Sequence, residues 1–301
     1  MIILDGKKLS EKILEDLKKK IQQENLKLSL VVILVGENPA SLMYIKQKEE
    51  KAKELRVSFE LKKIREEISV KELKEEINNV VFKKPTGIII QLPLPFHLKK
   101  NQSEILNLIP LKMDVDVLSQ NSRSRIGQKN ALLPPTVAGI LRLLKEYKID
   151  LKNKPRTSLP IYLKVLSAFQ ALIGKKVRGK KIVVVGRGFL VGEPLIKYLE
   201  TQGLDVESAD EFTEDLKAVT QKADILITGV GKPGLIKADM VKRGVVVVDA
   251  GISKVGNKLQ GDTDFESVSQ KVNAITPVPG GVGPMTVAMI FENLVKLTAK
   301  F

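Results

Sequence analysis

Apolar runs of strand length alternate with amphipathic stretches along the first half of the chain. Residues 28–36 (LSLVVILVG) and 87–95 (GIIIQLPLP) are continuous apolar runs that end at glycine or proline, as buried parallel strands do. Apolar positions recur at helical spacing in four other stretches, at 9–23, 40–55, 70–82 and 133–147. Ser10 is a candidate N-cap for the first of them. This alternation predicts an α/β protein with a parallel sheet.

The second half repeats the same rhythm more clearly. Five strand candidates follow one another, at 180–186, 204–210, 223–230, 244–252 and 274–278. Helical segments lie between several of them, which is typical of a parallel sheet of the Rossmann type.

The composition narrows the class of protein. The chain has 301 residues, enough for two ordinary domains, and 43% of them are apolar, enough for a full core. It has no cysteine, which excludes disulfides and thiol catalysis, and its one histidine argues against a zinc site. We interpret that residue, His97, as a structural loop histidine. No apolar run approaches the roughly 20 residues that span a membrane, and no secretion signal is evident, so we expect a cytoplasmic protein.

The net charge of +15 raises the question of nucleic-acid binding. Nine basic residues and no acidic ones lie between residues 151 and 181, so this segment alone supplies nine of the fifteen excess charges. The chain also has only four Tyr and nine Phe that could stack on bases. The distribution therefore argues against nucleic-acid binding as the main function.

A glycine-rich turn follows the strand candidate at 180–186. The text GRGFLVGEPL has the spacing G-x-G-x-x-x-G, formed by Gly186, Gly188 and Gly192, and leads into a helix. Bare backbone N–H groups at a helix N-terminus favour the pyrophosphate of a dinucleotide. The spacing is one residue longer than the standard fingerprint. A tight strand-to-helix turn with no ligand is the alternative interpretation.

The residues at the end of the next strand candidate bear on the choice of dinucleotide. Asp210 and Glu211 lie about 20 residues after the glycines, where a carboxylate binds the ribose hydroxyls of NAD and repels the extra phosphate of NADP. Arg187, inside the glycine turn, could instead bind that phosphate. The two carboxylates favour NAD, and each of these charges could also be a solvated loop residue.

A second group of polar residues lies in the first half. Tyr44 and Lys48 are four apart on one predicted helix and so share a face, although most such pairs are surface residues. Gln91 stands where a parallel strand ends, and ligands of open α/β sheets gather there. Asp114 and Asp116 would point the same way in an extended segment, or form the solvated face of a half-buried strand.

Taken together, these motifs resemble the bifunctional methylenetetrahydrofolate dehydrogenase/methenyltetrahydrofolate cyclohydrolase family. The matching pieces occur in family order over nearly the whole chain: VGENPASLMYIKQK, GIIIQLPLP, DVD, VVVGRGFLVGEP, ADILITGVGKPG, VVDAGI and ITPVPGGVGPMT. The last motif and the Tyr–Lys block are highly specific, and the glycine turn is much less so.

The resemblance implies two linked reactions. A hydride leaves 5,10-methylenetetrahydrofolate for NAD or NADP, and water then opens the methenyl cation to 10-formyltetrahydrofolate. Lys48 corresponds to the catalytic lysine, Tyr44 to its partner in the folate site, and Gln91 to the glutamine that bonds the lysine. Asp116 corresponds to the aspartate that binds the amino edge of the pterin.

The resemblance also implies an architecture and two residue sets. It implies two α/β lobes around a cleft, with the second a Rossmann lobe and the C-terminal helix returning to the first, and a homodimer. The expected domains are a folate-binding domain over 1–137 and 284–301 and a nicotinamide-binding domain over 138–283. The expected cofactor-binding residues are Gly186, Arg187, Gly188, Val191, Gly192, Asp210, Glu211, Gly229, Gly231 and Thr276. The expected substrate-binding residues are Tyr44, Lys48, Gln91, Leu92, Asp116, Pro279, Gly280 and Gly281, and no metal is expected.

Several positions depart from the family's pattern. Val117 replaces a glycine after DVD, Gly188 replaces a serine, and Asp210–Glu211 replaces a pair compatible with NADP. About 25 extra residues near 152–177 precede the Rossmann strand, and Thr157 or Ser158 could cap a helix there; we interpret this stretch as a solvated linker around a packed helix. The alternatives are a single-activity enzyme, either a dehydrogenase shifted to NAD or a cyclohydrolase only, and a folate- or RNA-binding protein with degraded catalysis.

Overall fold

The computed structural model describes residues 1–151, 179–256 and 258–299. The inserted segment near 152–177, with its expected helix, lies outside the described residues. The described chain divides into two compact units. Unit 1 comprises Met1–Leu4 and Leu141–Pro279, and unit 2 comprises Asp5–Ile140 and the segment from Gly280 onward. Among the described residues, no helix combines the length and apolar character needed to cross a bilayer.

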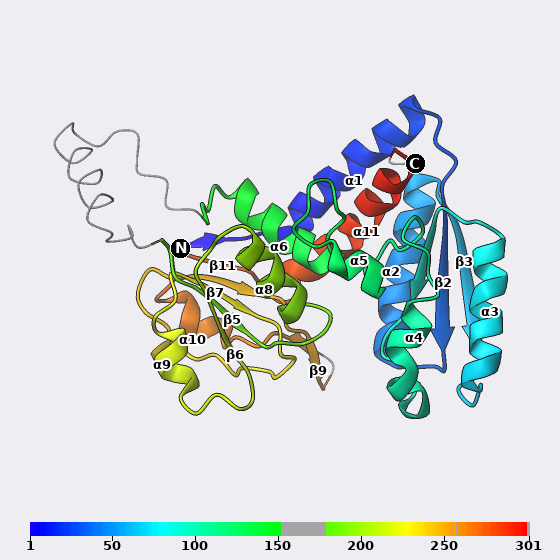
Figure 1. Ribbon diagram of the computed structural model, residues 1–301. Helices are drawn as coiled ribbons and strands as arrows, with labels where there is room; N and C mark the ends of the chain where they lie inside the picture. The colour runs from blue at the N-terminus through cyan, green and yellow to red at the C-terminus, as the bar shows by residue number, and fades with distance from the viewer. Residues whose placement is uncertain (152–178, 257, 300–301) are drawn as a thin grey trace. The chain divides into compact units, whose positions relative to one another are not determined.

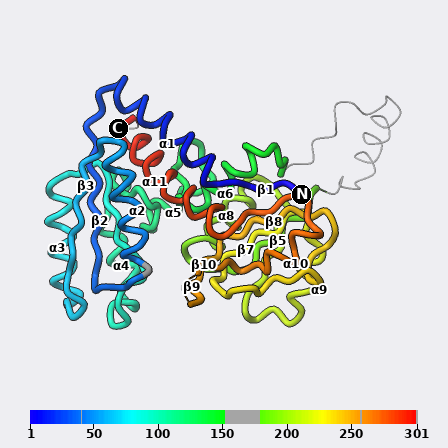
Figure 2. The backbone as a smooth tube through the Cα atoms, turned by 180° about the vertical axis from the view of Figure 1, so that it is seen from behind, coloured from blue at the N-terminus to red at the C-terminus, as the bar shows by residue number. Residues whose placement is uncertain are grey.

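Unit 1 is built on a parallel sheet of six strands in the order β1-β11-β8-β7-β5-β6. The strands are β1 (Ile2–Ile3), β5 (Ile182–Val185), β6 (Val206–Ala209), β7 (Ile225–Thr228), β8 (Val246–Asp249) and β11 (Ala274–Ile275). In Figure 2 the N-terminal strand β1 lies at the edge of this sheet. The parallel sheet expected from the sequence is therefore confirmed.

The other elements of unit 1 are short. They are α8 (Gly192–Thr201), α9 (Leu216–Thr220), η2 (Ala238–Met240), α10 (Phe265–Ser269) and the antiparallel pair β9 (Ser253–Val255) and β10 (Lys258–Gln260). All residues of β5 and β7 are buried, because helices and loops cover both faces of a parallel sheet. That burial explains why these strands are continuous runs of Ile, Val and Leu.

Unit 2 contains a parallel sheet of three strands in the order β3-β2-β4. The strands are β2 (Ser29–Val35), β3 (Ser58–Ile64) and β4 (Gly87–Ile90). The helices are α1 (Gly6–Gln23), α2 (Pro39–Leu55), α3 (Val70–Phe82), η1 (Phe96–Asn101), α4 (Gln102–Leu106), α5 (Gln120–Ser124), α6 (Pro135–Glu146), which continues into unit 1, and α11 (Val282–Thr298). Figure 1 shows α1 and α11 side by side, although they come from opposite ends of the chain.

Three expectations about element boundaries were wrong. Ser10 is not an N-cap; the cap lies five residues earlier, at Asp5, which accepts a 2.9 Å hydrogen bond from Lys8 N–H. The strand expected at 274–278 stops at Ile275, because the prolines that follow lack the N–H groups a ladder needs. The C-terminal helix, expected within 284–301, begins two residues earlier, at Val282.

Strand β3 was absent from the predicted elements. Its sequence SFELKKI carries three charged residues, Glu60, Lys62 and Lys63, and only Ile64 is buried. An edge strand pairs through its backbone and needs no apolar run, so periodicity does not reveal it. It extends the sheet beside β2, whose residues are nearly all buried.

Candidate active site

Lys48 and Gln91 lie together at the carboxyl end of the unit 2 sheet. Lys48 projects from α2 and donates a 2.8 Å hydrogen bond from Nζ to Oε1 of Gln91, the residue directly after β4. The amide of Gln91 also donates a 2.9 Å bond to the carbonyl of Leu92. The glutamine is thereby held from both ends of its amide, and the direction of the lysine ammonium is set without an added charge.

The environment of Lys48 opposes its positive charge. The residue is only 5% exposed, and this burial lowers its pKa, while the Asp116 carboxylate acts in the opposite direction. Burial also raises the pKa of Asp116, although Lys48 draws it down and Asp114 adds to the rise. Burial therefore favours the neutral form of both Lys48 and Asp116, and the charge on each group favours the charged form of the other.

Tyr44 lies one turn before Lys48 on α2 and is half-buried. Burial raises the pKa of its hydroxyl, so the phenol stays neutral. The N-terminus of α2 is joined to the end of β4, because Ser41 Oγ donates a 3.3 Å hydrogen bond to the carbonyl of Leu92. Helix α2 and the 91–92 segment are thus joined at two places near the lysine.

The two aspartates of the DVD sequence have different surroundings. Asp114 is 3% exposed, and its carboxylate accepts hydrogen bonds from the backbone N–H groups of Leu118 and Ser119 at 3.2 and 2.9 Å. The interpretation of both as a solvated acidic face is therefore wrong. Asp116 is half-buried and interacts electrostatically with Lys48. Asp114 braces the loop, and Asp116 is the carboxylate coupled to Lys48.

Val117 has a left-handed backbone, with φ of +58°, in a buried position. A β-branched residue rarely adopts this conformation, which costs about 1–3 kcal/mol. A glycine, which the resemblance implies at this position, adopts it without strain. The loop around Asp116 therefore keeps its turn despite the substitution, at an energetic cost.

The glycine turn in unit 1 has two glycines that the backbone itself requires. Gly186 has φ of +98°, and a Cβ on Gly192 would lie 1.8 Å from the carbonyl oxygen of Gly186. A Cβ on Gly188, by contrast, would meet nothing within 4 Å. The close approach brings the end of β5 against the first residue of α8, with half-buried Val191 as its N-cap residue. This is the strand–turn–helix that a dinucleotide phosphate needs.

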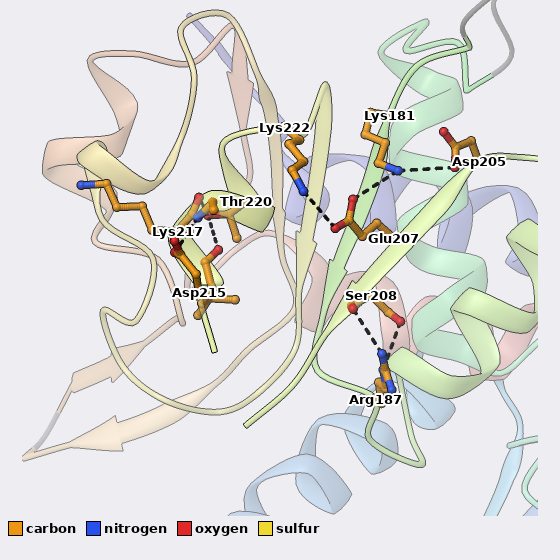
Figure 3. Close-up of polar contacts among 11 residues, drawn as sticks. Lys181, Arg187, Asp205, Glu207, Ser208, Asp215, Lys217, Thr220 and Lys222 are labelled. Atoms are coloured by element: carbon orange, nitrogen blue, oxygen red, sulfur yellow. Dashed lines mark hydrogen bonds and ion pairs between the residues drawn. The ribbon is translucent and has the colours of Figure 1, made fainter. Parts of the chain in front are cut away.

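Arg187 is hydrogen-bonded to the neighbouring strand β6. Its Nε donates a 3.0 Å hydrogen bond to Ser208 Oγ and its Nη2 a 3.3 Å bond to the Ser208 carbonyl, as Figure 3 shows. Its Nη1 also lies 3.4 Å from Oδ2 of Asp210. Glu211, the next residue, is exposed. The one arginine of the turn therefore already faces a carboxylate.

The segment after β7 is held by Asp262, a residue that the sequence-based prediction missed. One carboxylate oxygen accepts from Thr228 Oγ1 and Val230 N at 2.8 and 2.6 Å, and the other from Gly231 N and Lys232 N at 2.8 and 2.9 Å. Asp262 is fully buried. This internal carboxylate fixes the turn that carries Gly229 and Gly231.

Asp249, at the end of β8, lies next to Asp262 and was also missed. It accepts backbone bonds from Gly251, Asp262 and Thr263. Burial is the main cause that raises its pKa to about 6, and the neighbouring Asp262 carboxylate adds to it. The position of Asp249 at the carboxyl end of a parallel strand is a signal that could have been used.

The last glycine-rich loop has structural reasons for its small residues. Thr276 is buried, and its hydroxyl accepts a 2.7 Å bond from Asp249 N–H. In unit 2, Gly280 has φ of +109° and accepts a bond from Lys7 N–H, and a Cβ on Gly6 would lie 1.9 Å from the Gly281 carbonyl. Backbone therefore packs on backbone at the start of α1. Pro279, the last residue of unit 1, is exposed.

Two family models match the chain. Residues 4–116 match the catalytic domain of tetrahydrofolate dehydrogenase/cyclohydrolase, and residues 165–301 match its NAD(P)-binding domain. The chain belongs to this family. Among curated members of the tetrahydrofolate dehydrogenase/cyclohydrolase family, it is 41% identical over 303 residues to a bifunctional protein FolD of a Nitratiruptor species, covering 98% of this chain and 97% of that one.

Solved structures of the tetrahydrofolate dehydrogenase/cyclohydrolase family agree with this membership. The chain matches the bifunctional FolD enzyme of Campylobacter jejuni with a TM-score of 0.86 and 37% identity, over the full length of both chains. It matches a bifunctional enzyme of Thermoplasma acidophilum with a TM-score of 0.82 and 32% identity, covering 99% and 98% of the two chains. A Trypanosoma brucei member solved with NADP and an inhibitor shares the fold at 24% identity, covering 100% of this chain and 98% of that one, with a TM-score of 0.86.

Proposed function

We propose that this chain oxidises 5,10-methylenetetrahydrofolate to the 5,10-methenyl form and hydrolyses that form to 10-formyltetrahydrofolate. The observation that carries the proposal is the buried Lys48, bonded to Gln91 and coupled to Asp116 within unit 2. Family membership supports both activities. In this proposal unit 2 binds the folate and unit 1 binds the nicotinamide nucleotide.

The residues of unit 2 suit the chemistry of a cationic intermediate. A lysine whose pKa is lowered by burial can hold a proton or release it beside the methenyl carbon, which an ordinary surface lysine does poorly at neutral pH. Gln91 keeps its Nζ directed, and Tyr44 offers a neutral hydroxyl beside it. A carboxylate at Asp116 offers two acceptors to the planar N–H donors of a pterin.

The residues of unit 1 fit a dinucleotide. The turn from Gly186 to Gly192 leads into a helix N-terminus, and open space surrounds the backbone of Gly188, which is an arrangement suited to a pyrophosphate. The nicotinamide of the bound dinucleotide would supply the hydride acceptor, and the protein would align the nicotinamide ring with the folate. Arg187, Val191 and the segment with Gly229 and Gly231 complete the proposed contacts.

We further propose that the nucleotide is NAD. The guanidinium of Arg187, the group best suited to a 2′-phosphate, already faces the carboxylate of Asp210 and the oxygens of Ser208. A phosphate placed there would meet Asp210 and the nearby Glu211, and like charges at close range oppose binding. The ribose hydroxyls of NAD are hydrogen-bond donors to the same carboxylates.

The test supplies the purified full-length protein with 5,10-methylenetetrahydrofolate and either NAD or NADP. Reduced nucleotide reports the first step, and loss of methenyl absorbance after direct addition of 5,10-methenyltetrahydrofolate reports the second. We expect both signals, with a higher kcat/KM for NAD. Absence of the first signal with both nucleotides rules out the dehydrogenase, and methenyl loss no faster than in buffer rules out the cyclohydrolase.

The resemblance also supports a homodimer, which we propose as the state in solution. Light scattering coupled to size-exclusion chromatography measures the mass directly. A mass equal to the 33.3 kDa chain at micromolar concentration would contradict the dimer.

A further inference from the structure

The loop that presents Asp116 is fastened from the far end of the sequence. Asn293, on the C-terminal helix α11, is 2% exposed. Its amide nitrogen donates a 3.0 Å hydrogen bond to the carbonyl of Val115, the residue before Asp116. The same nitrogen donates a 2.9 Å bond to the carbonyl of Leu133, just before helix α6. One buried side chain therefore holds two loops of unit 2.

The chemistry of the site requires an amide. Both partners are backbone carbonyls, which only accept, so the group between them must supply two donors in one plane. An asparagine NH₂ has two such N–H bonds. A carboxylate of the same shape would place negative charge against two carbonyl oxygens, and an apolar side chain would leave both oxygens buried without partners.

The other hydrogen bonds that hold the Asp116 loop do not involve the Val115 carbonyl. Asp114 ties the loop forward to Leu118 and Ser119, and the backbone of Ile88 bonds the Met113 carbonyl. Between them the chain makes the left-handed turn at Val117. Asp116 is thus flanked on one side by a strained residue and on the other by the peptide group that Asn293 holds.

We propose that Asn293 is a positioning residue for the folate site, which acts by setting the direction of the Asp116 carboxylate toward the pterin and Lys48. The inference rests on the proposed function of Asp116 and names the group on which that function depends. A shift of about 1 Å in a binding group can cost as much as 100-fold in rate. Loss of the amide should therefore act on folate use and leave nucleotide binding unchanged.

The experiment uses the full-length chain with Asn293→Leu, Asn293→Ser and the control Val295→Ala. Leu matches the shape of asparagine without donors, Ser keeps one donor, and Val295 is a buried apolar residue of the same helix. We expect Leu to raise KM for 5,10-methylenetetrahydrofolate about tenfold or more, with an intermediate rise for Ser. KM for the nucleotide should stay within about twofold in every variant, and Val295→Ala should lower the melting temperature only.

A double-mutant cycle with Asp116→Ala separates positioning from general loosening. If Asn293 acts through Asp116, then Asn293→Leu has little further effect in the Asp116→Ala background. The inference is overturned if the effects of Asn293→Leu and Asp116→Ala on KM for the folate multiply in the double variant. It is also overturned if a folded Asn293→Ser variant has the wild-type KM. If the wild-type protein has no activity, the proposed function is wrong. If the wild type is active and the Asn293 variants behave like it, only the inference about Asn293 is wrong.

Discussion

Lys48 Nζ lies 2.8 Å from Gln91 Oε1, so the buried ammonium of α2 is satisfied by a neutral oxygen at the end of β4 rather than by a carboxylate. A neutral partner does not stabilise the charged lysine as strongly as an ion pair would. Burial consequently lowers the pKa of Lys48, and the more distant Asp116 only moderates that effect. The buried amine therefore gives up its proton more readily than a surface lysine does.

Replacing Lys48 should separate catalysis from folding. We expect Lys48→Met to lower the rate of methenyl hydrolysis by about 10²–10⁴-fold, the usual contribution of a general acid or base. The decrease of methenyl absorbance with time measures this rate. Lys46→Met, an exposed lysine on the same helix, is the matched control and should hydrolyse at the wild-type rate. Equal rates in Lys48→Met and wild type would refute the role of the lysine.

The same variant should change stability in a pH-dependent way. Because the folded state lowers the pKa of Lys48, the unfolded chain binds more protons between that lowered value and the ordinary lysine value of about 10.4. Wild-type stability therefore rises with pH through this window relative to Lys48→Met. Urea unfolding at pH 7 and pH 10 measures it. Lys48→Met should be at least as stable as wild type at pH 7, and its advantage should shrink at pH 10.

Asp249 should have the opposite pH dependence. Its folded pKa of about 6 lies above the ordinary aspartate value of about 3.9, so the folded state binds more protons between these values. Wild-type stability should therefore fall, by about 3 kcal/mol at most, relative to Asp249→Asn as pH rises from 4 to 6. Denaturant unfolding of both proteins across this range gives the difference. A constant difference would mean that the pKa is not raised.

Gly188 and Gly192 of the turn differ in what they tolerate. Gly192→Ala places a methyl group on the Gly186 carbonyl and should destabilise the protein by about 3 kcal/mol or more. Gly188→Ala meets open space and should change stability by less than about 0.5 kcal/mol. Thermal unfolding compares them. We expect Gly192→Ala also to lose nucleotide binding, and similar effects in both variants would contradict the assigned contact.

The nucleotide preference can be tested at Asp210. Asp210→Asn removes the carboxylate that faces Arg187 and should raise kcat/KM for NADP by about tenfold or more, because one like-charge contact with the phosphate is lost. Glu211→Gln, at the exposed neighbour, is the control and should have a smaller effect. Initial rates with each nucleotide give the ratio. An unchanged ratio in Asp210→Asn would show that this carboxylate does not select the nucleotide.

The sequence was most informative where its signal is local. Buried strands such as β2, β5 and β7 appear as apolar runs, and the shared face of Tyr44 and Lys48 follows from helical spacing alone. The glycine turn also stands out, because a tight strand-to-helix connection requires particular residues at particular positions. Each of these features depends on neighbours within a few residues.

Only the tertiary structure decided which distant residues meet. Strand β1 pairs with β11, Asp262 holds the turn after β7, and Asn293 bonds Val115 across 178 positions of sequence. None of these partners has a local pattern, because one buried hydrogen bond imposes no periodicity on either segment. The bare loop after β11 shows the same division: its prolines and glycines were visible in the sequence, whereas the close approach of Gly6 to the Gly281 carbonyl is made only when both ends of the chain pack together.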